Sequence, residues 1–157
     1  MIKVVYHIAD VHIRLYKRHS EFQTVLNRFY DMVLKDIKKR KLTKEEVRIA
    51  IAGDLVHSKN QMTPELVSFV IKMLNDCTDI CKTVIILGNH DFLANNLDRM
   101  DALSPLIESL ENNDILFYKH TGCYEDENVV WCVYSQITGS DRPNIEESKK
   151  KFPNKTH

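Results

Sequence analysis

The sequence lacks several features that would assign it to a class at once. Its formal net charge is zero, because 22 basic residues balance 22 acidic ones, so any nucleic-acid site has to be a local patch. Its longest apolar runs are far too short to cross a bilayer. Its first ten residues have no signal-peptide pattern. We therefore expect an intracellular protein, in cytoplasm, nucleus or nucleoid, that is not secreted and has no membrane partner.

Cysteine is present, but not in the pattern of a structural metal site. The four cysteines are Cys77, Cys81, Cys123 and Cys132. Cys77 and Cys81 lie four residues apart on a predicted helix, and no Cys-x-x-Cys occurs. This spacing favours reduced cysteines of an intracellular protein over a zinc knuckle.

What the chain does have is the composition of a soluble globular protein. It has 157 residues, 43% hydrophobic and 28% charged, which predicts a single domain over 1–157. Apolar runs and periodicities predict alternating strands and helices. The strands are expected at 2–9, 47–52, 82–87, 115–119 and 128–137, and the helices at 20–41, from Thr63 onward, and at 99–110.

This order of elements predicts an α/β fold. The first three strands are nearly continuous apolar runs, each followed by a helix, which is typical of parallel strands covered on both faces. Right-handed connections align the carboxyl ends of such strands along one edge of the sheet. Ligand sites of open α/β sheets gather at that edge.

Polar residues follow each of these three strands. Asp-x-His alone is common, and Gly-Asp-x-x-His could be a capped turn, but Gly-Asn-His-Asp is specific. The three motifs together, in order and each at a strand end, predict one shared site. They comprise Asp10 and His12, then Gly53, Asp54 and His57, then Gly88, Asn89, His90 and Asp91.

The residue types indicate a site for two divalent ions. Carboxylates, imidazoles and an amide oxygen suit borderline ions, with Mn²⁺ favoured and Mg²⁺ an alternative. Asp54, from the middle motif, is the natural bridge between two ions. Asp10 and His12 would hold one ion and Asn89 the other. His90 would stabilise the transition state or protonate the leaving oxygen.

These motifs resemble the calcineurin-like metallophosphoesterase superfamily, whose signature is Asp-x-His, Gly-Asp-x-x and Gly-Asn-His-Asp or Glu. The resemblance covers the first hundred residues. It implies a metallophosphoesterase-type α-β-β-α sandwich around a parallel βαβαβ core. By resemblance, Asp10, His12, Asp54 and Asn89 are metal ligands, and His90 is the catalytic histidine.

The second motif narrows the resemblance to one branch. Protein phosphatases of the superfamily continue Gly-Asp-x-x-Asp-Arg-Gly, whereas this chain has "GDLVHSKN". The stretch is similar to nuclease subunits of the SbcCD and Mre–Rad complexes and their phage and viral counterparts. That similarity implies DNA as substrate, a role in recombination or repair, and an SbcC- or Rad-type ATPase partner. His57 would then orient the scissile phosphate, or only position Asp54.

A basic cluster follows the first motif. Arg14, Lys17, Arg18 and His19 lie beside the expected metal site, where a DNA backbone would run. The alternative is a solvated loop at the start of a helix. Cations are unfavourable at a helix N-terminus, which favours phosphate contact, most of all for Arg14.

The second half departs from the superfamily pattern. A later histidine and a Gly-His-x-His, which normally complete the ligand set, do not occur before His157. We therefore expect a domain truncated in its C-terminal half, with a weakly held second ion and an open sheet edge that favours self-association, for instance as a homodimer. Two alternatives to the nuclease stay open: a phosphomonoesterase or small phosphodiesterase of the same superfamily, and an inactive binding module.

Overall fold

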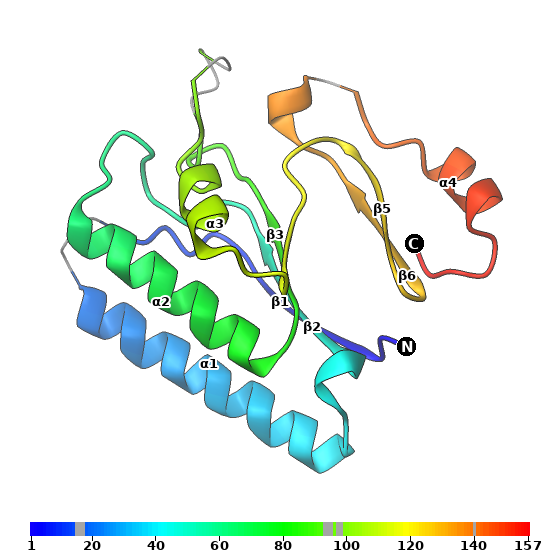
Figure 1. Cartoon of the computed structure of the whole chain (residues 1–157), viewed down its shortest axis with the longest axis horizontal. Coiled ribbons are helices and arrows are strands. Elements are labelled where there is room, and N and C mark those ends of the chain that lie inside the picture. The colour runs from blue at the N-terminus through cyan, green and yellow to red at the C-terminus, as the bar shows by residue number, and fades with distance from the viewer. Residues whose placement is uncertain (15–17, 93–95, 97–98, 140) are drawn as a thin grey trace.

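The computed structural model describes residues 1–14, 18–92, 96, 99–139 and 141–157. Its first half alternates strands and helices, as expected from the apolar runs (Figure 1). The parallel elements are β1 (Val4–Ile8), α1 (His19–Arg40), β2 (Val47–Ala52), α2 (Pro64–Ile80), β3 (Thr83–Ile86), α3 (Ser104–Leu110) and β4 (Ile115–Phe117). The antiparallel hairpin β5 (Gly122–Asp126) and β6 (Val129–Val133) and the helix α4 (Ile145–Lys151) follow, with short 3-10 turns at Lys44–Glu46 and Gln136–Thr138.

The parallel sheet has the strand order β1-β2-β3-β4. Each connection moves to the next strand in the same direction, so right-handed crossovers place α1, α2 and α3 on one face (Figure 1). Every strand therefore points its carboxyl end toward the same edge. The expected parallel βαβαβ core is confirmed.

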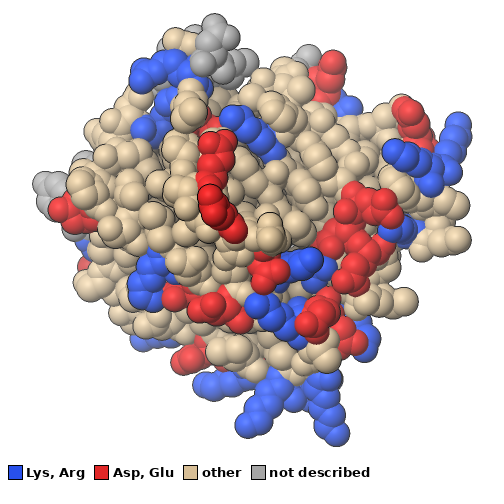
Figure 2. Space-filling view, viewed as in Figure 1, with Lys and Arg blue, Asp and Glu red and all other residues tan. Residues whose placement is uncertain are grey.

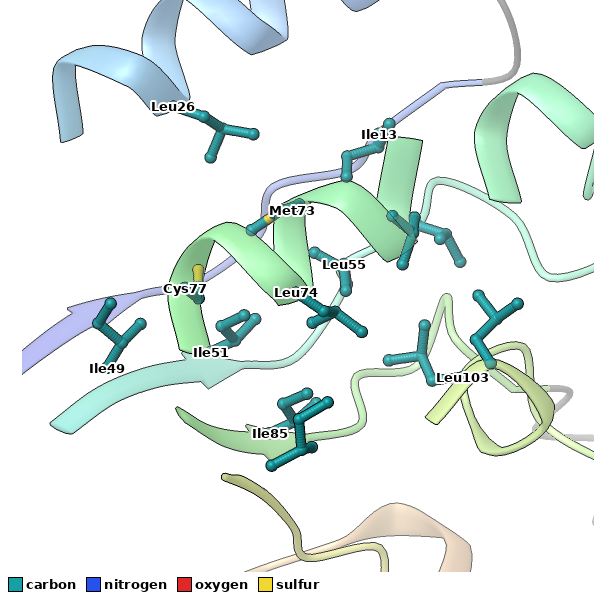
Figure 3. Packing of buried hydrophobic residues seen from close by; sticks show 14 of the residues in the cluster. Ile13, Leu26, Ile49, Ile51, Leu55, Met73, Leu74, Cys77, Ile85 and Leu103 are labelled. Atoms are coloured by element: carbon teal, nitrogen blue, oxygen red, sulfur yellow. The ribbon is translucent and has the colours of Figure 1, made fainter. Parts of the chain in front are cut away.

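The main core lies between this sheet and the helices. Alternate residues of β2, such as Ile49 and Ile51, point toward α2, where Met73 and Leu74 pack against them (Figure 3). All four side chains are at most 1% exposed. Burying an apolar side chain of this size contributes about 1.5–3 kcal/mol, so this layer supplies much of the folding free energy.

The opposite face of the sheet is covered by the hairpin β5–β6. Arg48, on β2 between core residues, points to this side and is 1% exposed. Its guanidinium donates to both carboxylate oxygens of Asp126 on β5, over 2.9 and 2.8 Å. With α4 beyond the hairpin, the layers run helix, sheet, hairpin, helix (Figure 1). This is the α-β-β-α arrangement that the resemblance implied.

Several element boundaries differ from the sequence predictions. The helix expected over 99–110 begins only at Ser104, because the Asp101 carboxylate accepts the main-chain N–H groups of Leu103 and Ser104 and forms a turn there. The strand β5 and the helix α4 were not expected. β5 contains a glycine and two acidic residues, so its apolar pattern is weak, and it exists because it pairs with β6.

Two surface features bear on partners. β1 has a strand neighbour on one side only among the described residues, and Val5 on it is 41% exposed. An open hollow of about 470 Å³ lies next to this edge, lined largely by apolar residues of α1, such as Phe22, and of the end of β1 and the segment after it, such as Val11. In the described part of the chain, no helix is both long enough and apolar enough to cross a membrane.

Candidate metal centre

The tips of β1, β2 and β3 are joined by main-chain hydrogen bonds. The N–H of Asp10 donates to Gly53 O over 3.2 Å, and the N–H of His12 donates to Asp54 O over 2.8 Å. The N–H of Gly53 in turn donates to Ile86 O over 2.9 Å. The three motifs that the sequence separates by tens of residues therefore form one rigid rim.

This rim brings together three of the predicted ligands. One ligand atom each from Asp10, His12 and Asp54 lies within 4.8 Å of the other two. The His12 Nε2 atom is 3.7 Å from Asp10 Oδ1 and 3.8 Å from Asp54 Oδ2. Asp10 is solvent-exposed and Asp54 is nearly buried, so the cluster opens to solvent on one side.

All three residues adopt the left-handed backbone conformation, with φ of 53°, 50° and 50° for Asp10, His12 and Asp54. Asp and His are among the residue types that tolerate this region, but it still costs free energy. The chain therefore leaves each strand by a sharp turn that directs these side chains toward one point. Strain of this kind concentrates at functional sites.

Gly88 allows the close approach of the second and third motifs. A Cβ atom at this position would lie 2.1 Å from Asp54 Oδ1 and 2.2 Å from Asp54 N. Any side chain here would displace the carboxylate that we expect to bridge two ions. The glycine in "GNHD" is thus required by packing against the second motif, which sequence spacing alone did not indicate.

His90 is held in a defined orientation next to Asp54. Its main-chain N–H donates to Asp54 Oδ1 over 2.8 Å. Its ring Nδ1 is 2.7 Å from the carbonyl oxygen of His57, which can only accept, so Nδ1 carries the proton. The Nε2 atom is therefore the one available for chemistry. The ring centroid lies 4.7 Å from that of His12.

His57 completes a group of three imidazoles. One nitrogen each of His12, His57 and His90 lies within 4.8 Å of the others. The Nδ1 atoms of His12 and His57 are buried and have no hydrogen-bond partner among the described residues. Burial, and then the positive charge of Arg14, lower the pKa of His57. His57 is therefore a neutral imidazole near pH 7, with a free nitrogen beside the carboxylates.

Asn89 lies on the same turn, between Gly88 and His90, and is exposed. Its neighbour Asp91, the last residue of the third motif, has a structural role. The Asp91 carboxylate is fully buried and accepts the main-chain N–H groups of Gly88 at 2.9 Å, Val56 at 3.0 Å and Leu55 at 3.3 Å. Asp91 thus ties the second motif to the third from beneath, and it does not reach the ligand cluster.

The predicted phosphate-contact residues are placed differently from one another. Arg14 is exposed, and its charge is felt by His57. Arg18 Nε lies 3.8 Å from Glu21 Oε2, and the ring of His19 packs against Phe69 with centroids 4.9 Å apart. Lys17 lies outside the described residues. Arg14 is therefore the member of this cluster that the structure relates to the metal rim.

Two further cations near the rim were missed in the sequence. The main-chain N–H of Lys59 donates to His90 O over 3.1 Å, and its side chain contacts Met100 O. Burial, and then the charge of Arg99, lower the pKa of Lys59. In the sequence, these two cations are marked only by their positions. Lys59 follows His57 by two residues, and Arg99 follows His90 by nine. Elsewhere the surface mixes both signs of charge, as Figure 2 shows for one face.

The donor set fits divalent ions. Carboxylates and imidazoles converge on one solvent-accessible point, and two imidazole nitrogens there are buried without a partner. Hard and borderline divalent cations prefer such oxygen and nitrogen donors. Neutral imidazoles and ionised carboxylates are also the protonation states that metal binding needs.

The parallel sheet of an α-β-β-α sandwich, with carboxylates and imidazoles at its carboxyl edge, is the arrangement that the metallophosphoesterase resemblance implied. The chain belongs to the calcineurin-like phosphoesterase family, whose model matches residues 3–155. Membership of this family is what the three motifs led us to expect.

Two comparisons place the chain among known proteins. It is 35% identical over 160 residues to "Uncharacterized protein R555" of Acanthamoeba polyphaga mimivirus, which covers 98% of this chain and 12% of the viral protein. It is similar to the crystal structure of Pseudomonas putida nuclease MPE, with 21% identity and a TM-score of 0.46, covering 78% of this chain and 50% of that one. The chain thus spans about an eighth of the viral relative.

Proposed function

We propose that this chain is the catalytic part of a metal-dependent DNA nuclease that cleaves phosphodiester bonds in recombination or repair. The observation that carries the proposal is the convergence of Asp10, His12 and Asp54 within 4.8 Å at the rim of the sheet. The second motif supports the nuclease branch, because it places His57 where protein phosphatases have Asp. Arg14, Lys59 and Arg99 around the rim support a polyanionic substrate.

The residues have distinct roles in this proposal. Asp10 and His12 would hold one divalent ion, Asn89 would hold the second, and Asp54 would serve both. When bound, such a pair of ions polarises a phosphoryl oxygen and supplies hydroxide near neutral pH. We favour Mn²⁺ for the donor set, with Mg²⁺ as the alternative.

The two remaining histidines act on the phosphate. The Nδ1–H group of His90 donates a hydrogen bond to His57 O. Its Nε2 atom is therefore left for the substrate and can carry a proton to the leaving oxygen. His57, held neutral, hydrogen-bonds the scissile phosphate and orients it. The hydrogen bond from His90 Nδ1 to His57 O and the lowered pKa of His57 support these roles.

The substrate and the partner subunit are also proposals. We propose DNA as substrate and an SbcC- or Rad-type ATPase as the partner subunit, on the resemblance of the second and third motifs to that branch. The homodimer expected from an open sheet edge also stays a prediction; β1 and its apolar hollow are the surface on which it would form.

The experiment compares two substrates. Purified chain is incubated with linear double-stranded DNA or p-nitrophenyl phosphate, with Mn²⁺, Mg²⁺ or EDTA. We expect DNA cleavage with Mn²⁺, none with EDTA, and loss of about 10²–10⁴-fold in His90→Gln. Asp31→Asn, on the exposed surface of α1, is the matched control and should cleave like the unmodified chain.

Two results would overturn parts of the proposal. Hydrolysis of the small ester with intact DNA would favour the phosphomonoesterase. Calorimetric titration with Mn²⁺ separates the third alternative: equal, negligible heats for the unmodified chain and Asp54→Ala would favour an inactive binding module over an enzyme.

A further inference from the structure

The hairpin that covers the second face of the sheet carries two cysteines side by side. Cys123 on β5 and Cys132 on β6 are direct cross-strand partners. Their sulfur atoms are 3.6 Å apart, and both are free thiols. Neither belongs to the metal rim, and neither has a part in the proposed hydrolysis.

The hydrogen bonding of β6 shows which kind of pair they form. The N–H of Val130 donates to Thr156 O over 2.7 Å, away from β5. Since the direction alternates along a strand, Cys132, two residues on, also directs its N–H away from β5. Cys123 and Cys132 are therefore a non-hydrogen-bonded pair, with Cα atoms about 4.5 Å apart.

That spacing allows a disulfide without movement of the strands. Bridged cysteines have Cα atoms about 4.4–6.8 Å apart, and their sulfurs lie about 2.05 Å apart. Rotation of the two side chains about χ1 is therefore enough to bring the sulfurs from 3.6 Å to bonding distance. The antiparallel register fixes the partners, so no other pairing competes within the hairpin.

An oxidant reaches this pair but not the other two cysteines. Cys123 borders an open hollow of about 210 Å³ between the hairpin and α4. Cys77 and Cys81 are completely buried, and burial raises the pKa of Cys77 to about 12 and of Cys81 to about 11. Burial raises the pKa of Cys132 to about 11 as well, so access separates the two pairs: Cys123 and Cys132 are only partly buried, whereas Cys77 and Cys81 are buried.

We propose that Cys123 and Cys132 form a reversible dithiol–disulfide site, oxidised by hydrogen peroxide and reduced by a dithiol. In the first step the Cys123 sulfur attacks the peroxide, giving a sulfenic acid and one water. In the second, the Cys132 sulfur attacks the sulfenic sulfur, forming the S–S bond and releasing a second water. Two electrons pass from the thiols to the peroxide, and a dithiol returns them by exchange.

The bond would act on the layer that holds the second face of the sheet. The same hairpin carries Asp126, whose carboxylate pairs with buried Arg48 and accepts from Trp131 Nε1 over 3.1 Å. A cross-link between β5 and β6 keeps this carboxylate in place and restricts the unfolded chain. Oxidation should therefore raise the unfolding temperature by several degrees.

The test uses the whole chain treated with hydrogen peroxide and then denatured. Titratable thiols should fall from four to two, the monomer should lose the mass of two hydrogen atoms, and peptide mapping should join Cys123 to Cys132. Trp131, the single tryptophan, adjoins the pair, so its fluorescence should fall on oxidation and recover with dithiothreitol. Cys77→Ser should oxidise like the unmodified chain, whereas Cys132→Ser should trap the sulfenic acid.

Other outcomes would overturn the proposal. The proposal fails if all four thiols survive oxidation, if the bridge includes Cys77 or Cys81, or if the product is found only as a disulfide between two chains. The mapping is done on the unmodified chain, so the result holds even if a serine variant fails to fold. The site is independent of the proposed nuclease activity.

Discussion

At the scale of single residues, the rim depends on buried groups that do not touch the reaction. Asp91 is the clearest case, since three main-chain N–H groups from two loops converge on its carboxylate. Burial raises the pKa of Asp91 and the three donors oppose that shift. Among the described residues these three N–H groups are its hydrogen-bond partners, so the Asp91 side chain holds the second and third motifs together.

Replacing Asp91 should therefore damage the fold and the site together. Asp91→Ala leaves three buried N–H groups without an acceptor, which we expect to cost about 3 kcal/mol or more in the free energy of unfolding. Asp91→Asn retains one acceptor oxygen and should cost clearly less. Urea denaturation with Mn²⁺ absent measures both; equal stability of the two variants would contradict this account.

His57 gives a prediction about pH. Its pKa is lowered in the folded protein, so the unfolded chain takes up a proton on this residue at a higher pH. The contribution of His57 to stability is therefore complete above its ordinary pKa, about 6.5, and is lost as pH falls through the lower folded value.

The measurement is the free energy of unfolding of the metal-free chain over a pH range that spans the ordinary pKa of histidine, about 6.5, from about pH 5 to about pH 8. Stability should fall toward acid pH in the unmodified chain, and His57→Gln should show a shallower fall over this interval. His120→Gln, in an exposed loop, is the control. An identical slope in His57→Gln would show that the ring titrates as it does in the unfolded chain.

At the scale of elements, the hairpin β5–β6 depends on one buried ion pair. Arg48 is 1% exposed and Asp126 is 8% exposed, and they share two hydrogen bonds across the interface between sheet and hairpin. Removing the Asp126 charge leaves the buried Arg48 with two main-chain carbonyls and the more distant Glu127 carboxylate at 3.5 Å, which compensate its charge poorly.

Asp126→Asn should therefore destabilise the chain by about 3–5 kcal/mol, whereas replacing both partners by apolar residues should recover much of the loss. The exposed pair Lys72–Asp76 on α2 is the control, and its removal should cost at most about 0.5 kcal/mol. Thermal denaturation of these three variants and of the unmodified chain checks this. A double variant no more stable than Asp126→Asn would mean that the hairpin needs the charges themselves.

At the scale of the whole molecule, the formal net charge is zero, but positively charged side chains flank the metal rim. Arg14 and Lys59 come from different loops and flank the same site, while the basic last turn of α1 lies about 30 Å from its start. If DNA runs across the rim, each phosphate contact contributes to the dependence of affinity on salt.

We expect Arg14→Ala to weaken DNA binding and to reduce the slope of log affinity against log salt by about 1. Lys39→Ala, at the far end of α1, should change neither. Fluorescence anisotropy with labelled duplex and Ca²⁺ in place of Mn²⁺ measures binding without cleavage. Equal slopes for both variants would place the DNA elsewhere on the surface.

The sequence by itself determined the parallel core and the edge at which the motifs meet. Largely apolar runs such as Thr83–Ile86 fix strands through their own burial, and right-handed crossovers fix where those strands end. The three motifs together also predicted that Asp54 and His90 lie at this shared edge, where the main-chain N–H of His90 donates to Asp54 Oδ1. These inferences needed only local pattern and chain chirality.

The tertiary structure decided everything that depends on contact between distant segments. β5 has too weak an apolar pattern to be seen alone and forms by pairing with β6, and Arg48 is buried only because Asp126, 78 residues later, meets it. The same holds for Gly88 against Asp54, for Asp91 beneath two loops, and for Cys123 opposite Cys132. Local sequence encodes propensity and burial, whereas these pairings arise from the free energy of the assembled layers.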